Sequence, residues 1–278
     1  MALAAERTPR AAARHRPLPW WQPLRERPHL IRLLSLVVFF AIWEYSAKGA
    51  SVLFIVPPSA IVEATVKLFE KGLIVKLFLE SVEHFWMGTA ISIVAGIILG
   101  AVTATWWQVE YTLDPFINGF YAVPKPALVP LFILWFGFET LSKTIIIVSV
   151  AIFPVIVNTY AGIRDVRGAM LDVGRAFGAT PQQIFFKIIV PGAIPYIMTG
   201  IRLCVGLGIV GMVIAEFFTA MVGFGGLVRD SADRFETAEV YFAVIVIGVI
   251  GIVATELIAV VERRISRWRI LEKERAQG

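Results

Sequence analysis

Three charged side chains, Lys125, Arg202 and Glu216, lie inside segments that are otherwise apolar. Ionised groups are costly away from water, so such residues either mark the path of a charged solute or reach the membrane surface through a long side chain. We predict Lys125 and Glu216 as candidates for lining a translocation pathway, with an interfacial position as the alternative for each. Arg202 is expected at the inner interface. About 21 Å of helical rise separates Arg202 from Glu216, which is too far for an ion pair.

The sequence holds no group of residues that would support catalysis or metal binding. His15, His29 and His84 are scattered, and a buried Gly-x-Ser-Gly nucleophile is absent. The G-x-x-x-x-G-K-[ST] loop that cradles the phosphates of ATP is absent too. Cys204 is the single cysteine and lies in an apolar segment, so we interpret it as a packing residue. We therefore predict no catalytic residue, no metal site and no cofactor on this chain, which argues against an enzyme.

The composition favours an integral membrane protein. Hydrophobic residues make up 58% of the chain and charged residues 17%, a balance that a water-soluble domain cannot cover with polar surface. A helix needs about 20 residues to cross the hydrocarbon core of a bilayer. We predict an all-α fold with six transmembrane helices, over residues 30–47, 85–105, 116–138, 144–163, 197–220 and 241–261.

The distribution of basic residues predicts the orientation of these helices. Seven arginines lie in residues 1–32, and six lysines or arginines lie in residues 263–275. An even number of spans puts both ends on one side, and the positive-inside rule makes that side the cytoplasm. The net charge of +5 is thereby explained by the membrane, without nucleic acid as a partner.

The segments outside the spans divide the chain further. We expect residues 1–29 to form a disordered basic cytoplasmic arm that contacts anionic membrane lipid, and residues 266–278 to form a basic cytoplasmic tail. Residues 48–82 are expected outside the membrane, with Ser59 as the N-cap of an amphipathic helix that ends near Gly72. The remaining residues, 83–265, form the membrane core.

Two predicted spans carry features beyond apolarity. Three prolines surround Lys125 between positions 124 and 130, and each removes a backbone donor. Irregular backbone survives at membrane depth only where protein or water satisfies it, so we expect this broken span to face the interior of the bundle. Gly96 and Gly100 have the GxxxG spacing that allows a second helix to approach closely.

The loop over residues 164–195 is patterned like structure rather than like a linker. Residues 166–177 have helical periodicity, and Gly178 interrupts it. Thr180 can cap a second helix over residues 182–190, with Pro181 in its first turn. Two short helices that meet at an angle form an elbow, either for docking into a partner protein or as a simple interfacial hairpin.

This loop resembles the EAA loop of ABC-importer permeases, in which Glu-Ala-Ala, three residues, Gly, nine residues and Ile-x-Leu-Pro form the helix that couples to the ATPase. Gly178, Ile188 and Pro191 match at the required spacing. Val190 replaces Leu, and Asp-Val-Gly at 172–174 replaces Glu-Ala-Ala. The resemblance implies that coupling to the ATPase involves Asp172, Val173, Gly174, Gly178, Ala179, Ile188 and Pro191.

Four more segments resemble the nitrate, sulfonate and taurine branch of that family: PKPALVPLFILWFGFETLSK from Pro124, GIRLCVGLGIVGMVIAEFF from Gly200, VGFGGLV from Val222 and VERRISRW from Val261. The resemblance implies a type I ABC-importer transmembrane fold over residues 83–265 and a multi-pass location in the bacterial inner membrane. The function it implies is passage of a small anionic solute, such as nitrate, a sulfonate or taurine.

The partners that this resemblance implies are an ABC ATP-binding subunit, which holds ATP and magnesium, and a periplasmic or lipid-anchored substrate-binding protein. A second copy of the permease would complete the pathway as a homodimer. The alternative function is that of an ion-coupled secondary transporter subunit, since broken helices and isolated intramembrane charges suit that class too. A secondary transporter, however, would give the EAA-like loop no role.

Overall fold

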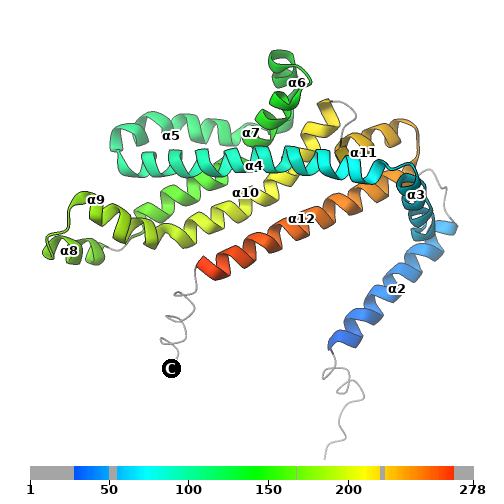
Figure 1. Cartoon of the computed structure of the whole chain (residues 1–278), viewed down its shortest axis with the longest axis horizontal. Helices are drawn as coiled ribbons and strands as arrows, with labels where there is room; N and C mark the ends of the chain where they lie inside the picture. The colour runs from blue at the N-terminus through cyan, green and yellow to red at the C-terminus, as the bar shows by residue number, and fades with distance from the viewer. Residues whose placement is uncertain (1–27, 50–54, 167, 220–222, 266–278) are drawn as a thin grey trace, which may run out of the picture.

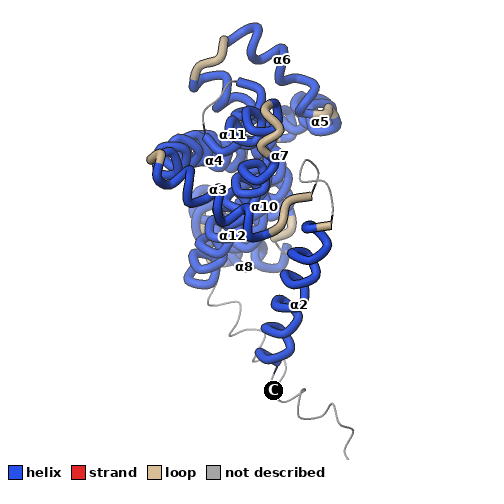
Figure 2. The backbone as a smooth tube through the Cα atoms, turned by 90° about the vertical axis from the view of Figure 1, so that its right-hand side faces the viewer, coloured by secondary structure: helices blue, strands red, loops and turns tan. Residues whose placement is uncertain are grey.

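The computed structural model describes residues 28–49, 55–166, 168–219 and 223–265. Its ordered elements within these ranges are all helices (Figure 2). The predicted basic arm, apart from its last two residues, and the predicted basic tail lie outside the described ranges. Within the described ranges, five helices are long and apolar enough to cross a membrane, or six if one bent pair counts as a span. The all-α fold is therefore confirmed, and the predicted six spans are reached if the bent pair is counted as one.

The first three helices are α2 (Pro28–Lys48), α3 (Pro58–Glu70) and α4 (Leu73–Thr105). Gly72 joins α3 to α4 with a φ of +68°, so α3 ends where the sequence predicted. The N-cap of α3 is Pro57, and the prediction of Ser59 for this role is wrong. The amide and hydroxyl of Ser59 instead donate to the Glu44 carboxylate at 3.1 and 2.8 Å, which ties α3 to α2.

The proline-rich span is broken into α5 (Trp107–Ala122) and α6 (Lys125–Phe136), which meet at 102°. The break falls at Val123 and Pro124, where both residues are extended. Two consequences of the prolines were predicted, and only one is correct. The helix is interrupted, but α5 buries none of its residues and α6 buries only Val129, so neither faces the interior of this single chain.

The core consists of α4, α7 (Thr140–Arg164) and α10 (Val190–Thr219), with α12 (Thr237–Ile265) beside α10. Small residues allow the close approach of α4 to α7. A Cβ added at Gly96 would lie 2.6 Å from Val155, and one at Gly100 would lie 2.8 Å from Thr159. The packing role predicted for this GxxxG pair is therefore confirmed.

The remaining elements lie at the two ends of this bundle (Figure 1). One end carries α8 (Gly168–Ala176), α9 (Pro181–Ile184) and the π-helical segment η1 (Phe185–Ile189). The opposite end carries α3 and α11 (Gly223–Asp233). The second helix of the predicted elbow does not end at residue 190, because η1 continues directly into α10. The elbow is thus rigidly connected to a core span.

Candidate functional site

The elbow turns at Gly178, which has a φ of +72°. This left-handed conformation is strained for side chains with a Cβ and free for glycine. Thr180 then caps α9: its hydroxyl accepts from the Gln183 amide, and the Gln183 side chain accepts from the Thr180 amide. This capping box and Pro181 in the first turn fix the direction of the chain as it returns to the membrane.

The two arms of the elbow contact each other through Gly174. This glycine is buried, and an added Cβ would lie 2.7 Å from Cδ1 of Ile188 and 3.5 Å from Cγ1 of Ile184. Glycine in place of the second alanine of the EAA pattern therefore lets α8 lie directly on the following arm. Asp172 is exposed and pairs with Arg175 at 3.3 Å.

The seven residues predicted for coupling thus fall into two groups. Gly174, Gly178 and Ile188 hold the arms of the elbow together, with Ala179 half-buried in the turn. Asp172, Val173 and Pro191 are exposed on its surface.

An exposed apolar stripe runs along α8 and onto the residue after it, and motif matching named only Val173 of its three members. Met170, Val173 and Phe177 follow one another at helical spacing of three and four, and Phe177 is 88% exposed. Phe186 on η1 is exposed as well. Large apolar side chains gathered on a projecting surface indicate an interaction site. Their spacing was visible in the sequence, but their exposure was not, because a helix can turn its apolar stripe toward its own fold.

The ammonium of Lys125 is engaged by backbone carbonyls, and its predicted place in a pathway stays a prediction. Its Nζ donates to the carbonyl oxygens of Phe120, Tyr121 and Val123 at 2.6, 3.1 and 2.8 Å. These are carbonyls at the end of α5, which lack helical partners. A lysine ammonium has three donors, so all of them are engaged. Lys125 therefore caps α5 and fixes the bend to α6, at 5.0 Å from the ring of Phe153.

We expect Lys125→Met to loosen this bend without changing solute affinity. Loss of the charge-assisted hydrogen bonds should reduce stability by about 2 kcal/mol. The check is thermal unfolding of the purified protein, together with the KM of solute uptake. An increased KM with an unchanged unfolding temperature would instead show that Lys125 contributes to solute binding in the pathway.

Glu216 is fully buried near the end of α10 that lies opposite the elbow, where three elements enclose its carboxylate. Oε2 accepts from Ser81 Oγ at 3.0 Å and from the Gly225 amide at 2.9 Å, and Oε1 lies 3.3 Å from Nδ1 of His84. Ser81 in turn accepts from the Phe224 amide. The carboxylate therefore joins α4, α10 and the N-terminus of α11, where a negative charge is favourable. Within this chain Glu216 therefore has a packing role, and its predicted place in a translocation pathway stays a prediction.

Charged residues near the elbow end are also engaged within the chain. Arg202 forms an ion pair with Glu262 of α12. Arg164 at the end of α7 pairs with Glu110 of α5, and the Tyr160 hydroxyl donates to the same carboxylate. These contacts hold α5 against α7 and α12 against α10.

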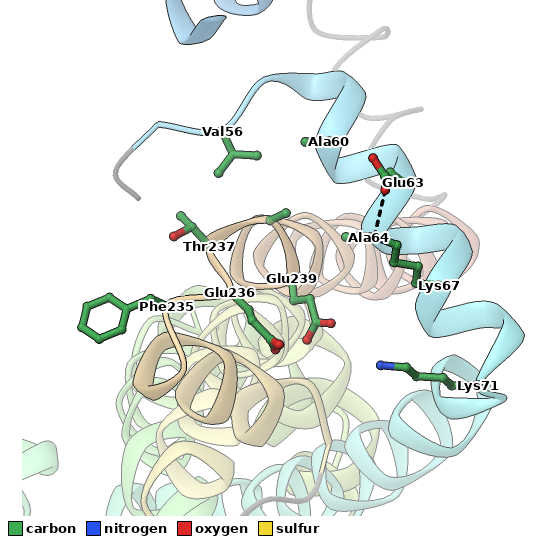
Figure 3. A pocket seen from close by; sticks show the side chains of 11 residues that line it. Val56, Ala60, Glu63, Ala64, Lys67, Lys71, Phe235, Glu236, Thr237 and Glu239 are labelled. Carbon is green, nitrogen blue, oxygen red and sulfur yellow. Dashed lines mark ion pairs between the residues drawn. The ribbon is translucent and has the colours of Figure 1, made fainter. Parts of the chain in front are cut away.

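A cavity of about 370 Å³ lies at the opposite end, between α3 and the turn from α11 to α12 (Figure 3). Glu63 and Lys67 pair at 2.8 Å on its α3 side, and this hydrogen bond lowers the pKa of the Glu63 carboxyl. Glu236 and Glu239 lie across from them, and Lys71 extends into the space between. This surface of mixed charge suits contact with a polar partner.

Similarity to known proteins identifies the family to which this bundle of helices belongs. Residues 92–267 match the model of the family described as the inner membrane component of binding-protein-dependent transport systems. The chain belongs to this family. The protein is therefore a multi-pass component of the bacterial inner membrane, a permease rather than an enzyme.

Individual relatives support this assignment. The permease is 35% identical to an aliphatic sulfonates transport permease protein, SsuC, of Bacillus subtilis, over 66% of each chain. It is 30% identical to the formylaminopyrimidine transport permease ThiX of Halalkalibacterium halodurans, over 85% of this chain and 94% of that protein. It is 27% identical to the taurine transport system permease TauC of Escherichia coli, over 91% and 94% of the respective chains. The predicted resemblance to the nitrate, sulfonate and taurine branch is confirmed.

Proposed function

We propose that this permease forms the translocation pathway of an ATP-driven importer for a small anionic solute, and that its elbow docks on the ATP-binding subunit. The exposed apolar stripe of Met170, Val173 and Phe177 carries the proposal, because it projects from the membrane helices on a capped turn. Membership of a binding-protein-dependent transport family implies an ATP-binding partner and a substrate-binding partner. Relatives that are named for sulfonates and taurine support the choice of an anion.

The elbow can transmit motion because it is continuous with a core span. The second arm of the elbow, which packs against Gly174, runs through η1 into α10 without a loop. Movement of a docked ATPase would shift α10 against α4 and α7, and thereby favour one of two packings of the bundle. Docking at this end implies that the elbow and both termini are cytoplasmic, as the basic residues predicted.

The opposite end is then the outer surface, where a substrate-binding protein delivers the solute. Phe235 lies on the rim of the outer cavity, 74% exposed, with a φ of +57° that is rare for residues other than glycine. An exposed aromatic ring in such a conformation suits a contact with the delivering protein. A second copy of this permease would cover the exposed α5 and α6 and complete the pathway as a homodimer.

Purification of the tagged permease from native membranes in mild detergent tests the proposal. We expect a stoichiometric partner that contains a phosphate-binding loop, with ATPase activity that Gly178→Arg abolishes while the protein stays in the membrane. Uptake at the wild-type rate in Gly178→Arg would refute docking through the elbow. Uptake by the chain alone, driven by an ion gradient, would identify a secondary transporter.

A further inference from the structure

The residues that enter the elbow are in contact with those that leave it. Asp165 follows the last residue of α7, and its carboxylate accepts a hydrogen bond from the Tyr196 hydroxyl of α10. Gly162 is buried about one turn earlier, where an added Cβ would lie 2.6 Å from Cβ of Tyr196. Close beside this bond, an added Cβ at Gly192 would lie 3.2 Å from Cγ2 of Val166. Such packed contacts make the base of the elbow one body with the adjoining ends of α7 and α10.

Arg164 links this body to α5. It is the last residue of α7, and it forms an ion pair with Glu110 of α5. The Tyr160 hydroxyl, one turn earlier on α7, donates to the other oxygen of the same carboxylate. The Arg164 guanidinium also lies 5.6 Å from the centre of the Tyr160 ring. Two charge-assisted hydrogen bonds from one helix thus fix the carboxylate in direction as well as in position.

The position of α5 depends on this ion pair, because little else holds its end near the elbow. The helix buries none of its residues within this chain. Among the described residues of α5, Glu110 is the one whose side chain bonds to another helix of the core, and the other side-chain hydrogen bonds of α5 stay within the helix. Toward the bend, the ring of Tyr121 contacts that of Phe153, with 5.6 Å between the centroids.

These two contacts act near opposite ends of α5. About 16 Å of helical rise separates Glu110 from Tyr121. A displacement of Arg164 therefore pulls the end of α5 near the elbow, while the aromatic contact restrains the end near the bend, so α5 tilts. The tilt is passed on to α6, because Lys125 fixes the bend between the two helices.

A second ion pair near the same end of the bundle provides a comparison. Arg202 of α10 pairs with Glu262 of α12, and in both pairs the arginine is about half exposed and the glutamate about a quarter exposed. Pairs with this much exposure add little to stability. However, α12 also packs along α10 and α11, so its position does not depend on its ion pair as that of α5 does. The two pairs are alike in chemistry and differ in what they position.

We propose that Glu110 and Arg164 form the joint through which movement of the elbow reaches the broken span of α5 and α6, with Tyr160 orienting the carboxylate. The inference rests on the proposed function, from which it takes docking of the ATPase on the elbow. It gives movement of the elbow a second route besides α10. Glu110 and Arg164 are positioning residues in this role, and they need not contact the solute.

The accessibility of one cysteine on α5 tests the joint in the purified complex of permease and ATPase in lipid nanodiscs. Gln108→Cys places a thiol at an exposed position in the first turn of α5, and the native Cys204 is fully buried. Its reaction rate with a water-soluble maleimide is measured without nucleotide and after trapping with magnesium, ATP and vanadate. With no further substitution, we expect trapping to change this rate by about threefold or more, because the two packings of the bundle place α5 differently.

Glu110→Gln and Arg164→Gln should each abolish most of this change, while the co-purified ATPase and the trapped nucleotide stay at wild-type amounts. The two substitutions together should lose no more than either alone, because each removes the same interaction. Glu110→Arg combined with Arg164→Glu should restore part of the change, which loss of a merely structural contact would not predict. Arg202→Gln is the matched control and should keep the full change.

A change in rate that persists in Arg164→Gln would overturn the joint, and so would an equal loss in Arg202→Gln. The same conclusion follows if trapping leaves the rate unchanged in the protein that carries Gln108→Cys alone. Failure of the proposed function looks different, because no ATPase would then co-purify with any variant or with the wild type, and the joint would be abandoned with it.

Discussion

We expect the substitution Phe177→Asp to detach the ATP-binding subunit from this permease. The ring is 88% exposed and directly follows α8 at the end of the apolar stripe, so in the free protein it has little packing to lose. A buried aromatic anchor commonly contributes about 2 kcal/mol or more to an interface, which corresponds to a roughly 30-fold loss of affinity. A carboxylate would add a desolvation cost when the elbow docks. Co-purification of the ATPase and ATP-driven uptake measure the effect.

Phe177→Leu is the control for this prediction, because it keeps an apolar side chain at the same position. We expect it to retain most of the bound ATPase, and both variants to reach the membrane in wild-type amounts. The docking proposal fails if Phe177→Asp co-purifies with the ATPase as well as Phe177→Leu does.

Gly223→Ala should disrupt the end of the bundle that lies opposite the elbow. A Cβ at this position would lie 2.3 Å from Cδ of Glu216, which is far inside contact distance, and the φ of +71° is unfavourable for alanine. The Glu216 carboxylate cannot move aside without losing its bonds to Ser81 and Gly225. An unsatisfied buried carboxylate and the strained backbone together should cost several kcal/mol. We expect a large decrease in unfolding temperature and in the yield of monodisperse protein.

Gly72→Ala separates backbone strain from the clash. Gly72 has nearly the same φ, +68°, but nothing lies within 4 Å of its added Cβ. Its substitution should cost only the strain of a left-handed alanine, about 1–2 kcal/mol. Equal losses of stability in Gly72→Ala and Gly223→Ala would show that the contact between Gly223 and Glu216 contributes nothing to the fold.

Local sequence patterns predicted the elements that depend on neighbouring residues alone. The elbow break at Gly178 and the cap at Thr180 follow from backbone preference and from a side chain that bonds three residues away. The GxxxG pair on α4 was interpreted correctly, because small residues at one-turn spacing have few other uses in an apolar helix. The break at Pro124 was expected too, since proline removes a helical donor.

Predictions that depended on where a side chain meets the rest of the fold were less successful. Ser59 has the chemistry of an N-cap, yet Glu44 on α2 takes its hydrogen bonds. Lys125 was the conspicuous cation in an apolar segment, but carbonyls up to five residues back along the chain engage it fully. Lys143 stands at the edge of a predicted span, where lysine is ordinarily exposed, yet it is only 7% exposed.

The sequence by itself determined that this protein is a bundle of apolar helices with a structured elbow, because hydrophobic length, proline, glycine and capping residues act locally. It also placed the chain in its transport family, because several segments match in order. Only the tertiary structure decided which charges are engaged. Glu216 is enclosed by residues up to 135 positions away, and the Lys125 ammonium is held by carbonyls of the preceding helix. The physical reason is that the energy of a charge depends on every helix packed around it, and that neighbourhood exists only after folding.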